Sequence, residues 1–150
     1  SLRVFLKKGK KVKIENNVKS MLKAEEEFGI KNFKTYKNFG EKVYKIRENV
    51  TKNLKDLKKK NSLVIGYGAP AKATTALNFF GVTNELDFIV EDNKLKHDKF
   101  IPGVKIPIRK KEEIKNDDNT VVVLAWNFFH DIKKNNSVLS KNFINIKDLE

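Results

Sequence analysis

The sequence predicts an α/β fold, in which helices flank a Rossmann-like parallel sheet and a helical connector precedes it. Short apolar runs alternate with helical patterns between residues 61 and 150, and a glycine-rich turn follows the first run. Earlier in the chain, most apolar side chains recur at helical spacing. We therefore expect a strand within residues 1–10, a helical connector over residues 11–60 and a Rossmann-like domain over residues 61–150.

Composition favours one folded domain and excludes several kinds of site. The 150 residues are 39% hydrophobic, which is enough to bury a core. Cysteine is absent, which excludes disulfides and thiolate zinc sites, and His97 and His130 have no metal-binding spacing. No apolar run approaches the ~18 residues that cross a membrane, and no signal-peptide pattern is present. We expect a cytoplasmic protein with no bound metal and no membrane partner.

The net charge of +13 has two interpretations. A basic surface attracts nucleic acid or another anion, so a nucleic-acid or interaction module is one hypothesis. However, lysine greatly outnumbers arginine and is spread along the chain, whereas base and phosphate readers usually interleave arginine with aromatic residues. We therefore do not expect nucleic acid as a partner.

Two helical patterns make up the predicted connector. Residues 17–28 place apolar side chains on one face, and Gly29 supplies a stop. A longer apolar stripe over residues 33–57 covers about a third of the second helix. Such a stripe usually packs against another element, so we expect it to lie in the core. Its members are Phe33, Tyr36, Phe39, Val43, Tyr44, Ile46, Val50, Leu54 and Leu57.

From residue 62 the pattern changes to strand, turn and helix. The apolar run 63–65 is typical of a central parallel strand, and Pro70 suits a first helical turn. A helix is expected over residues 71–80, ending at Gly81. The remaining expected elements are strands over 86–90, 105–108, 120–126 and 143–146, a polar loop over 93–103, a helical turn over 110–114 and a helix over 127–135.

The turn "GYGAPA" over residues 66–71 matches the G-x-G-x-x-G/A template of nucleotide-binding folds. In that template Gly66 allows a tight turn, Gly68 lets the backbone approach a ligand, and Ala71 lets helix and strand pack closely. The start of the following helix is a ready anion site, to which Lys72 adds a positive charge.

The template alone leaves several ligands open. Glu91 follows the next strand about 20 residues later, where a dinucleotide-binding domain holds the ribose. A stand-alone NAD(P)-type nucleotide-binding module is therefore one hypothesis, and a structural turn without a ligand is another. The chain offers no constellation for acid–base catalysis, because neither histidine has an evident partner.

Trp126 and Asn127 end the predicted strand 120–126 and should lie on the same rim as the glycine turn. Trp126 could stack on a base or a sugar, or it could be a core aromatic residue. Asn127 could bind a ligand or cap the next helix. The polar loop on this rim supplies Asn93 and Lys96, with further lysines at 94 and 99.

In the order of these motifs, the chain resembles the C-terminal domain of the S-adenosylmethionine-dependent sugar C-methyltransferases. The most specific match is "VIGYGAPAK", which agrees beyond the glycines at Tyr67, Ala69, Pro70 and Lys72. "VEDNKLK", "FIPGVKIPI" and "LAWNFFHDI" also resemble the family pattern. The chain departs from that pattern at Glu91, Lys94 and Asp98, where the family usually has Asp, Pro and Gly.

The resemblance implies a role for this chain within a larger methyltransferase. Residues 1–10 would be the last strand of an upstream methyltransferase domain, which would bind S-adenosylmethionine and carry the catalytic groups, while a further upstream domain would bind zinc. This chain alone would be inactive, would need no cofactor, and would hold a nucleotide-linked sugar. The residues assigned to substrate binding are Gly66, Tyr67, Gly68, Ala69, Pro70, Ala71, Lys72, Glu91, Asn93, Lys96, Trp126 and Asn127.

Overall fold

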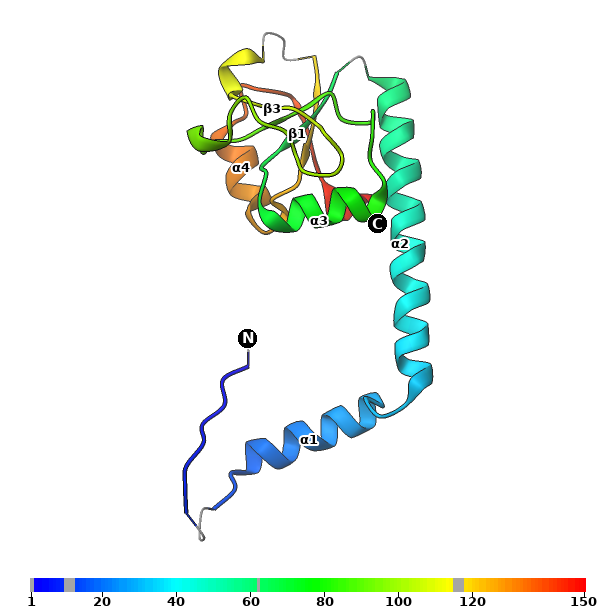
Figure 1. Ribbon diagram of the computed structural model, residues 1–150, viewed down its shortest axis with the longest axis vertical. Coiled ribbons are helices and arrows are strands. Elements are labelled where there is room, and N and C mark those ends of the chain that lie inside the picture. Colours follow the sequence, from blue (N-terminus) through cyan, green and yellow to red (C-terminus); the bar gives the residue numbers. More distant parts are fainter. Residues whose placement is uncertain (1, 10–12, 62, 115–117) are drawn as a thin grey trace. The chain divides into compact units, whose positions relative to one another are not determined.

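The computed structural model describes residues 2–9, 13–61, 63–114 and 118–150 (Figure 1). The chain forms two compact units, Ser1–Lys42 and Val43–Glu150. Helix α2 (Phe33–Lys60) contributes residues to both units. Among the described residues, no helix combines the length and the apolar character that a membrane span requires.

The first unit contains helix α1 (Asn16–Phe28) and the start of α2. Helix α1 ends as expected at Gly29, which adopts a left-handed φ of 80° and returns its N–H to the carbonyls of Glu25 and Glu26. Residues 2–9 form no strand, and the other residues of the predicted strand 1–10 lie outside the described ranges. None of the described side chains between residues 2 and 42 is buried.

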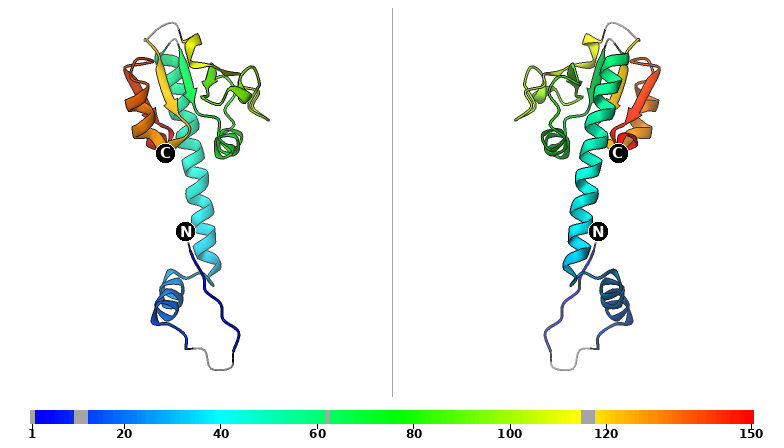
Figure 2. Two further views of the ribbon diagram at one scale, coloured as in Figure 1. Left: turned by 90° about the vertical axis from the view of Figure 1, so that its left-hand side faces the viewer. Right: turned by 90° about the vertical axis from the view of Figure 1, so that its right-hand side faces the viewer.

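The second unit is built on five parallel strands in the order β3-β2-β1-β4-β5, which is the Rossmann arrangement (Figure 2). The predicted fold class is therefore confirmed. The strands are β1 (Val64–Tyr67), β2 (Phe88–Val90), β3 (Ile108–Arg109), β4 (Thr120–Val123) and β5 (Asn142–Asn145).

Helices cover both faces of this sheet (Figure 1). On one face, Val50 and Leu54 of α2 pack with residues of α3 (Ala71–Phe80) against alternate strand residues. On the other face, Phe129 and Ile132 of α4 (Phe129–Asn135) pack against the intervening ones. Strands buried on both faces read as continuous apolar runs, which is why residues 63–65 and 120–123 stand out in the sequence.

Gly66 has a different role from the one expected. It lies inside strand β1, opposite Ile89 of β2, and not in the turn. A Cβ at this position would lie 2.7 Å from Cγ1 of Ile89 and 3.1 Å from Cδ1 of Leu124. Glycine is therefore needed because neighbouring side chains fill the space above the strand.

Several element boundaries differ from the sequence prediction. The predicted strand 120–126 ends at Val123, and Trp126–Phe128 forms a short 3-10 helix, η3, before α4 begins. The polar loop after β2 contains another such turn, η1 (Lys94–Lys96). The predicted turn over 110–114 is the 3-10 helix η2 (Lys111–Glu113), and the chain ends in η4 (Ile146–Leu149), which the pattern did not indicate.

Candidate functional site

A cleft of about 350 Å³ opens at the carboxyl ends of β1, β2 and β4. Strands β1 and β4 are sheet neighbours but are not consecutive in the sequence, so the cleft lies at the point where the strand order reverses. Open α/β sheets bind their ligands at such a point. Its lining residues are Tyr67, Gly68, Pro70, Lys72, Glu91, Asp92, Lys96, Ala125, Phe128 and Ile132.

The turn after β1 passes close to the end of β4. Gly68 has a left-handed φ of 88°, and a Cβ there would lie 2.9 Å from the Cβ of Ala125. Its N–H donates to the carbonyl of Val90 at 2.8 Å. Gly68 is therefore the residue that needs glycine for the turn, and its N–H binds within the sheet.

Glu91 joins the turn after β1 to the loop after β2. One carboxylate oxygen, Oε2, accepts hydrogen bonds from the N–H of Ala69 at 2.9 Å and from the ammonium of Lys96 at 3.2 Å. The other, Oε1, accepts from the N–H of Asn93 at 3.0 Å. Lys96 also donates to the carbonyl of Ala69 at 2.9 Å. We call Ala69, Glu91 and Lys96 the Glu91 clamp.

Electrostatics keep the Glu91 carboxylate ionised. Its side chain is only 13% exposed, and this burial by itself raises the pKa. The hydrogen bonds from Asn93 and Ala69, together with the bond to Lys96 and its positive charge, outweigh the burial and lower the pKa below its usual value. The Glu91 carboxylate is therefore negatively charged at neutral pH.

Tyr67 reaches the floor of the cleft from β1. Its buried hydroxyl donates to the Asp92 carboxylate at 2.9 Å and lies 3.2 Å from Oδ1 of Asn136. Burial and the contact with Asp92 raise the pKa of Tyr67 above its ordinary value. This phenol is consequently a neutral hydrogen-bond donor and is poorly suited to act as a base.

Lys72 stands at the start of α3, with its ammonium 3.9 Å from the centre of the Trp126 ring. Trp126 is partly buried against the core, so it is a packed aromatic residue, and its stacking on a base or a sugar stays a prediction. The structure shows no hydrogen-bond partner for the N–H groups of Ala71 and Lys72 among the residues it describes. Two backbone donors and one cation therefore lie at this edge.

Other predicted site residues lie outside the cleft lining. The Asn93 side chain accepts from the N–H of Leu95 at 3.0 Å and so caps η1. Asn127 is exposed within η3, and the N-cap of α4 is Phe128, so the predicted cap at Asn127 is wrong. Ala71 is exposed, and Ala73 is the buried alanine that packs α3 on the sheet.

The pattern also missed residues that the fold brings to the cleft. Asp92, Phe128 and Ile132 line it, yet none was singled out in the sequence. The available signals were the position of Asp92 directly after a strand and the helical spacing of 128 and 132. In the described part of the chain, no group of three or more acidic, histidine or cysteine side chains is placed to hold a metal.

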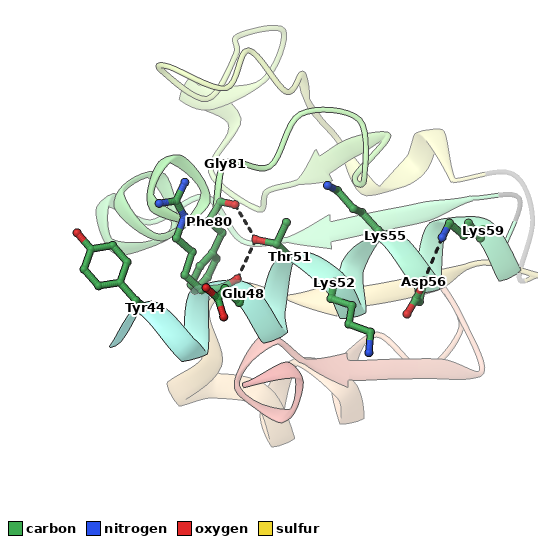
Figure 3. Close-up of a pocket in the computed structure, with 10 residues that line it drawn as sticks. Tyr44, Glu48, Thr51, Lys52, Lys55, Asp56, Lys59, Phe80 and Gly81 are labelled. Atoms are coloured by element: carbon green, nitrogen blue, oxygen red, sulfur yellow. Dashed lines mark hydrogen bonds and ion pairs between the residues drawn. The ribbon is translucent and has the colours of Figure 1, made fainter. Parts of the chain in front are cut away.

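A larger hollow, of about 720 Å³, lies along α2 beside the end of α3 (Figure 3). Tyr44, Lys52 and Lys55 of α2 line it together with Phe80 and Gly81. It is open, and it lies at the end of α3 opposite the glycine turn. Of these two hollows, we place the candidate site at the smaller cleft, because it lies at the carboxyl ends of the central strands β1 and β4.

Comparison with known proteins identifies the family of this chain. C-methyltransferase NovU of Streptomyces niveus is 29% identical to the chain over 127 residues, which make up 83% of this chain and 30% of NovU. The chain thus spans about 30% of the length of this curated relative. The family described as the C-methyltransferase C-terminal domain matches residues 1–145. Because that match covers nearly the whole chain, the protein belongs to the C-methyltransferase C-terminal domain family.

Proposed function

We propose that this domain binds a nucleotide-linked sugar and positions it for methylation by another part of the full-length protein. The observation that carries the proposal is the cleft at the reversal of strand order, which brings the cation of Lys72 to the same edge as the phenol of Tyr67. A sugar nucleotide offers matching chemistry, because its phosphates attract cations and its hydroxyls bind polar side chains. The family supports the link to carbon methylation.

The work of this chain in such a reaction is binding and orientation. In the proposed reaction a base on another domain would remove a proton from the sugar carbon beside a ketone. S-adenosylmethionine would supply the methyl group to that carbon and leave as S-adenosylhomocysteine. Binding energy from the distant nucleotide would hold the sugar in the geometry that this step needs. We place S-adenosylmethionine on another domain, because the N–H groups of Gly68 and Ala69, which a cofactor on this turn would use, already bind within the chain.

A titration with TDP-glucose, followed by amide NMR, tests the proposal. We expect signals of Tyr67, Lys72 and Phe128 to move, and Lys72→Ala to weaken binding about tenfold through loss of a charge-assisted contact. Lys52→Ala, in the hollow on α2, is the matched control and should bind as the parent chain does. Unmoved cleft signals at millimolar TDP-glucose would rule the proposal out.

We further propose that the first unit contacts an upstream methyltransferase domain. Apolar side chains of α1 and of the start of α2 are exposed here, including Leu22 at 60% and Phe39 at 66%. NovU extends well beyond the matched region, which supports the presence of further domains in the full-length protein. Amide exchange in α1 should be slower in the full-length protein than in this chain, and equal rates would contradict the contact.

A further inference from the structure

The glycine turn of this domain already binds an anionic group of the chain itself, the carboxylate of Glu91. Glycine turns that bind phosphate do so with backbone N–H groups at the start of a helix and with a nearby cation. In this chain the Glu91 carboxylate accepts from the N–H of Ala69 and from the ammonium of Lys96. These are the kinds of donor that a phosphate would use.

The backbone N–H groups of Gly68 and Ala69 in the turn both have partners within the chain. The N–H of Gly68 binds the carbonyl of Val90. The N–H of Ala69 binds Glu91, and the carbonyl of Ala69 accepts from Lys96. Within the described residues, the first N–H groups of this segment without a partner are therefore those of Ala71 and Lys72, beyond the turn.

We infer that Glu91 is a built-in substitute for a ligand phosphate and closes the glycine turn to pyrophosphate. A pyrophosphate in the turn would have to displace a carboxylate that holds three hydrogen bonds, or lie beside its negative charge. The anionic part of a ligand is then restricted to the edge at Lys72. This selectivity goes beyond the proposed function, and it disfavours a dinucleotide bound through this turn.

Loss of the Glu91 carboxylate should have an effect that a merely structural role for this residue does not predict. Removing the carboxylate frees the N–H of Ala69 and the ammonium of Lys96 and takes away a negative charge. The variant should therefore gain a phosphate site that the parent chain lacks. A residue that only braced the two loops would lose stability when truncated and gain nothing.

The test is a titration of the chain with inorganic pyrophosphate, followed by backbone amide NMR. In the parent chain we expect the amide of Lys72 to move and that of Ala69 to stay in place. In Glu91→Ala the Ala69 amide should move as well, and the affinity should rise about tenfold through the new charge-assisted contacts. Glu112→Ala is the matched control, because it removes the same charge from an exposed neighbouring position.

Three results would overturn the inference. They are a parent Ala69 amide that moves with pyrophosphate, a Glu91→Ala variant whose Ala69 amide stays still, and an equal gain in Glu112→Ala. If Glu91→Ala does not fold, Glu91→Gln keeps the side-chain shape and should show a smaller gain at Ala69; no gain there would also reject the inference. The Ala69 amide reports on the turn, whereas TDP-glucose tests the cleft, so failure of the TDP-glucose titration would reject the proposed function and leave the result at Ala69 standing.

Discussion

The two units of the chain carry similar apolar patterns and differ in what those patterns meet. In the second unit, Val50 and Leu54 of α2 are fully buried against the sheet. In the first unit, Phe33 of the same helix is 80% exposed, and none of the described residues up to 42 is buried. Helical periodicity therefore identifies an apolar face that can pack against another element, but it does not show whether this chain supplies that element.

The largest effect is expected from shortening a buried side chain in the packed second unit. Leu54→Ala should lower the free energy of unfolding by about 2–5 kcal/mol, because it removes a fully buried side chain and leaves a cavity. Denaturant unfolding of the 150-residue chain measures the loss. A change below about 1 kcal/mol would mean that α2 is less firmly packed on the sheet than the structure shows.

The Glu91 clamp is a charged contact at the sheet edge of the packed second unit, and its contribution to stability depends on pH. The pKa of Glu91 is lowered in the folded chain, so the folded state binds fewer protons than the unfolded state near this value. The clamp thus stabilises fully above the usual glutamate pKa of about 4.3 and is lost as pH falls through the lower folded value.

Glu91→Gln removes this contribution and should cost about 1.5–3 kcal/mol at neutral pH, as for hydrogen bonds to a charged group. Thermal unfolding between about pH 7 and pH 3 should show a steeper loss of stability in the parent chain than in the variant. Parallel pH profiles would contradict the charged clamp.

Gly66→Ala tests packing inside the sheet. The added Cβ would lie 2.7 Å from a side-chain carbon of Ile89, so that neighbour must shift. We expect a loss of about 1–3 kcal/mol, typical of overpacking, measured by chemical unfolding. Gly40→Ala is a suitable control, because nothing lies within 4 Å of a Cβ there and helix propensity favours alanine. An equal loss in both variants would count against the packing role of Gly66.

The smallest effect is expected in the first unit. Leu22→Ala makes the same chemical change as Leu54→Ala, but at a side chain that is 60% exposed, so stability should change by no more than about 0.5 kcal/mol. Calorimetry of the two leucine variants provides the comparison directly. A large loss at Leu22 would show that the exposed face is covered in solution and would remove the contrast between the units.

Much of the fold was predictable from sequence because its signals are local. The apolar run before the glycine turn, the helix 71–80 and the stop at Gly81 all depend on neighbouring residues, and the structure confirms them. The strand 120–126 was predicted too long: Leu124 continues the apolar run, and its N–H still binds the carbonyl of Tyr67, but strand β4 itself ends at Val123. Apolar character reports burial and not strand pairing.

The candidate site was predictable in place but not in its contacts. The glycine turn and the residues after β2 and β4 lie at one edge, as parallel topology requires. No local pattern, however, showed that Glu91 would turn inward to Ala69, or that Lys72 would lie over Trp126. These partners are 22 and 54 positions apart, so only the folded chain brings them together.

Local sequence therefore specified the succession of strands and helices, the glycine turn and the edge where a ligand would bind, because backbone preferences and apolar periodicity act over a few residues. Tertiary structure alone decided that Gly66 packs within a strand, that the Glu91 carboxylate binds the N–H of Ala69 in the turn, and that four of the nine side chains of the α2 stripe stay exposed. Each of these outcomes depends on atoms from distant positions meeting or failing to meet, and a hydrogen bond or a packed contact exists only where both partners arrive.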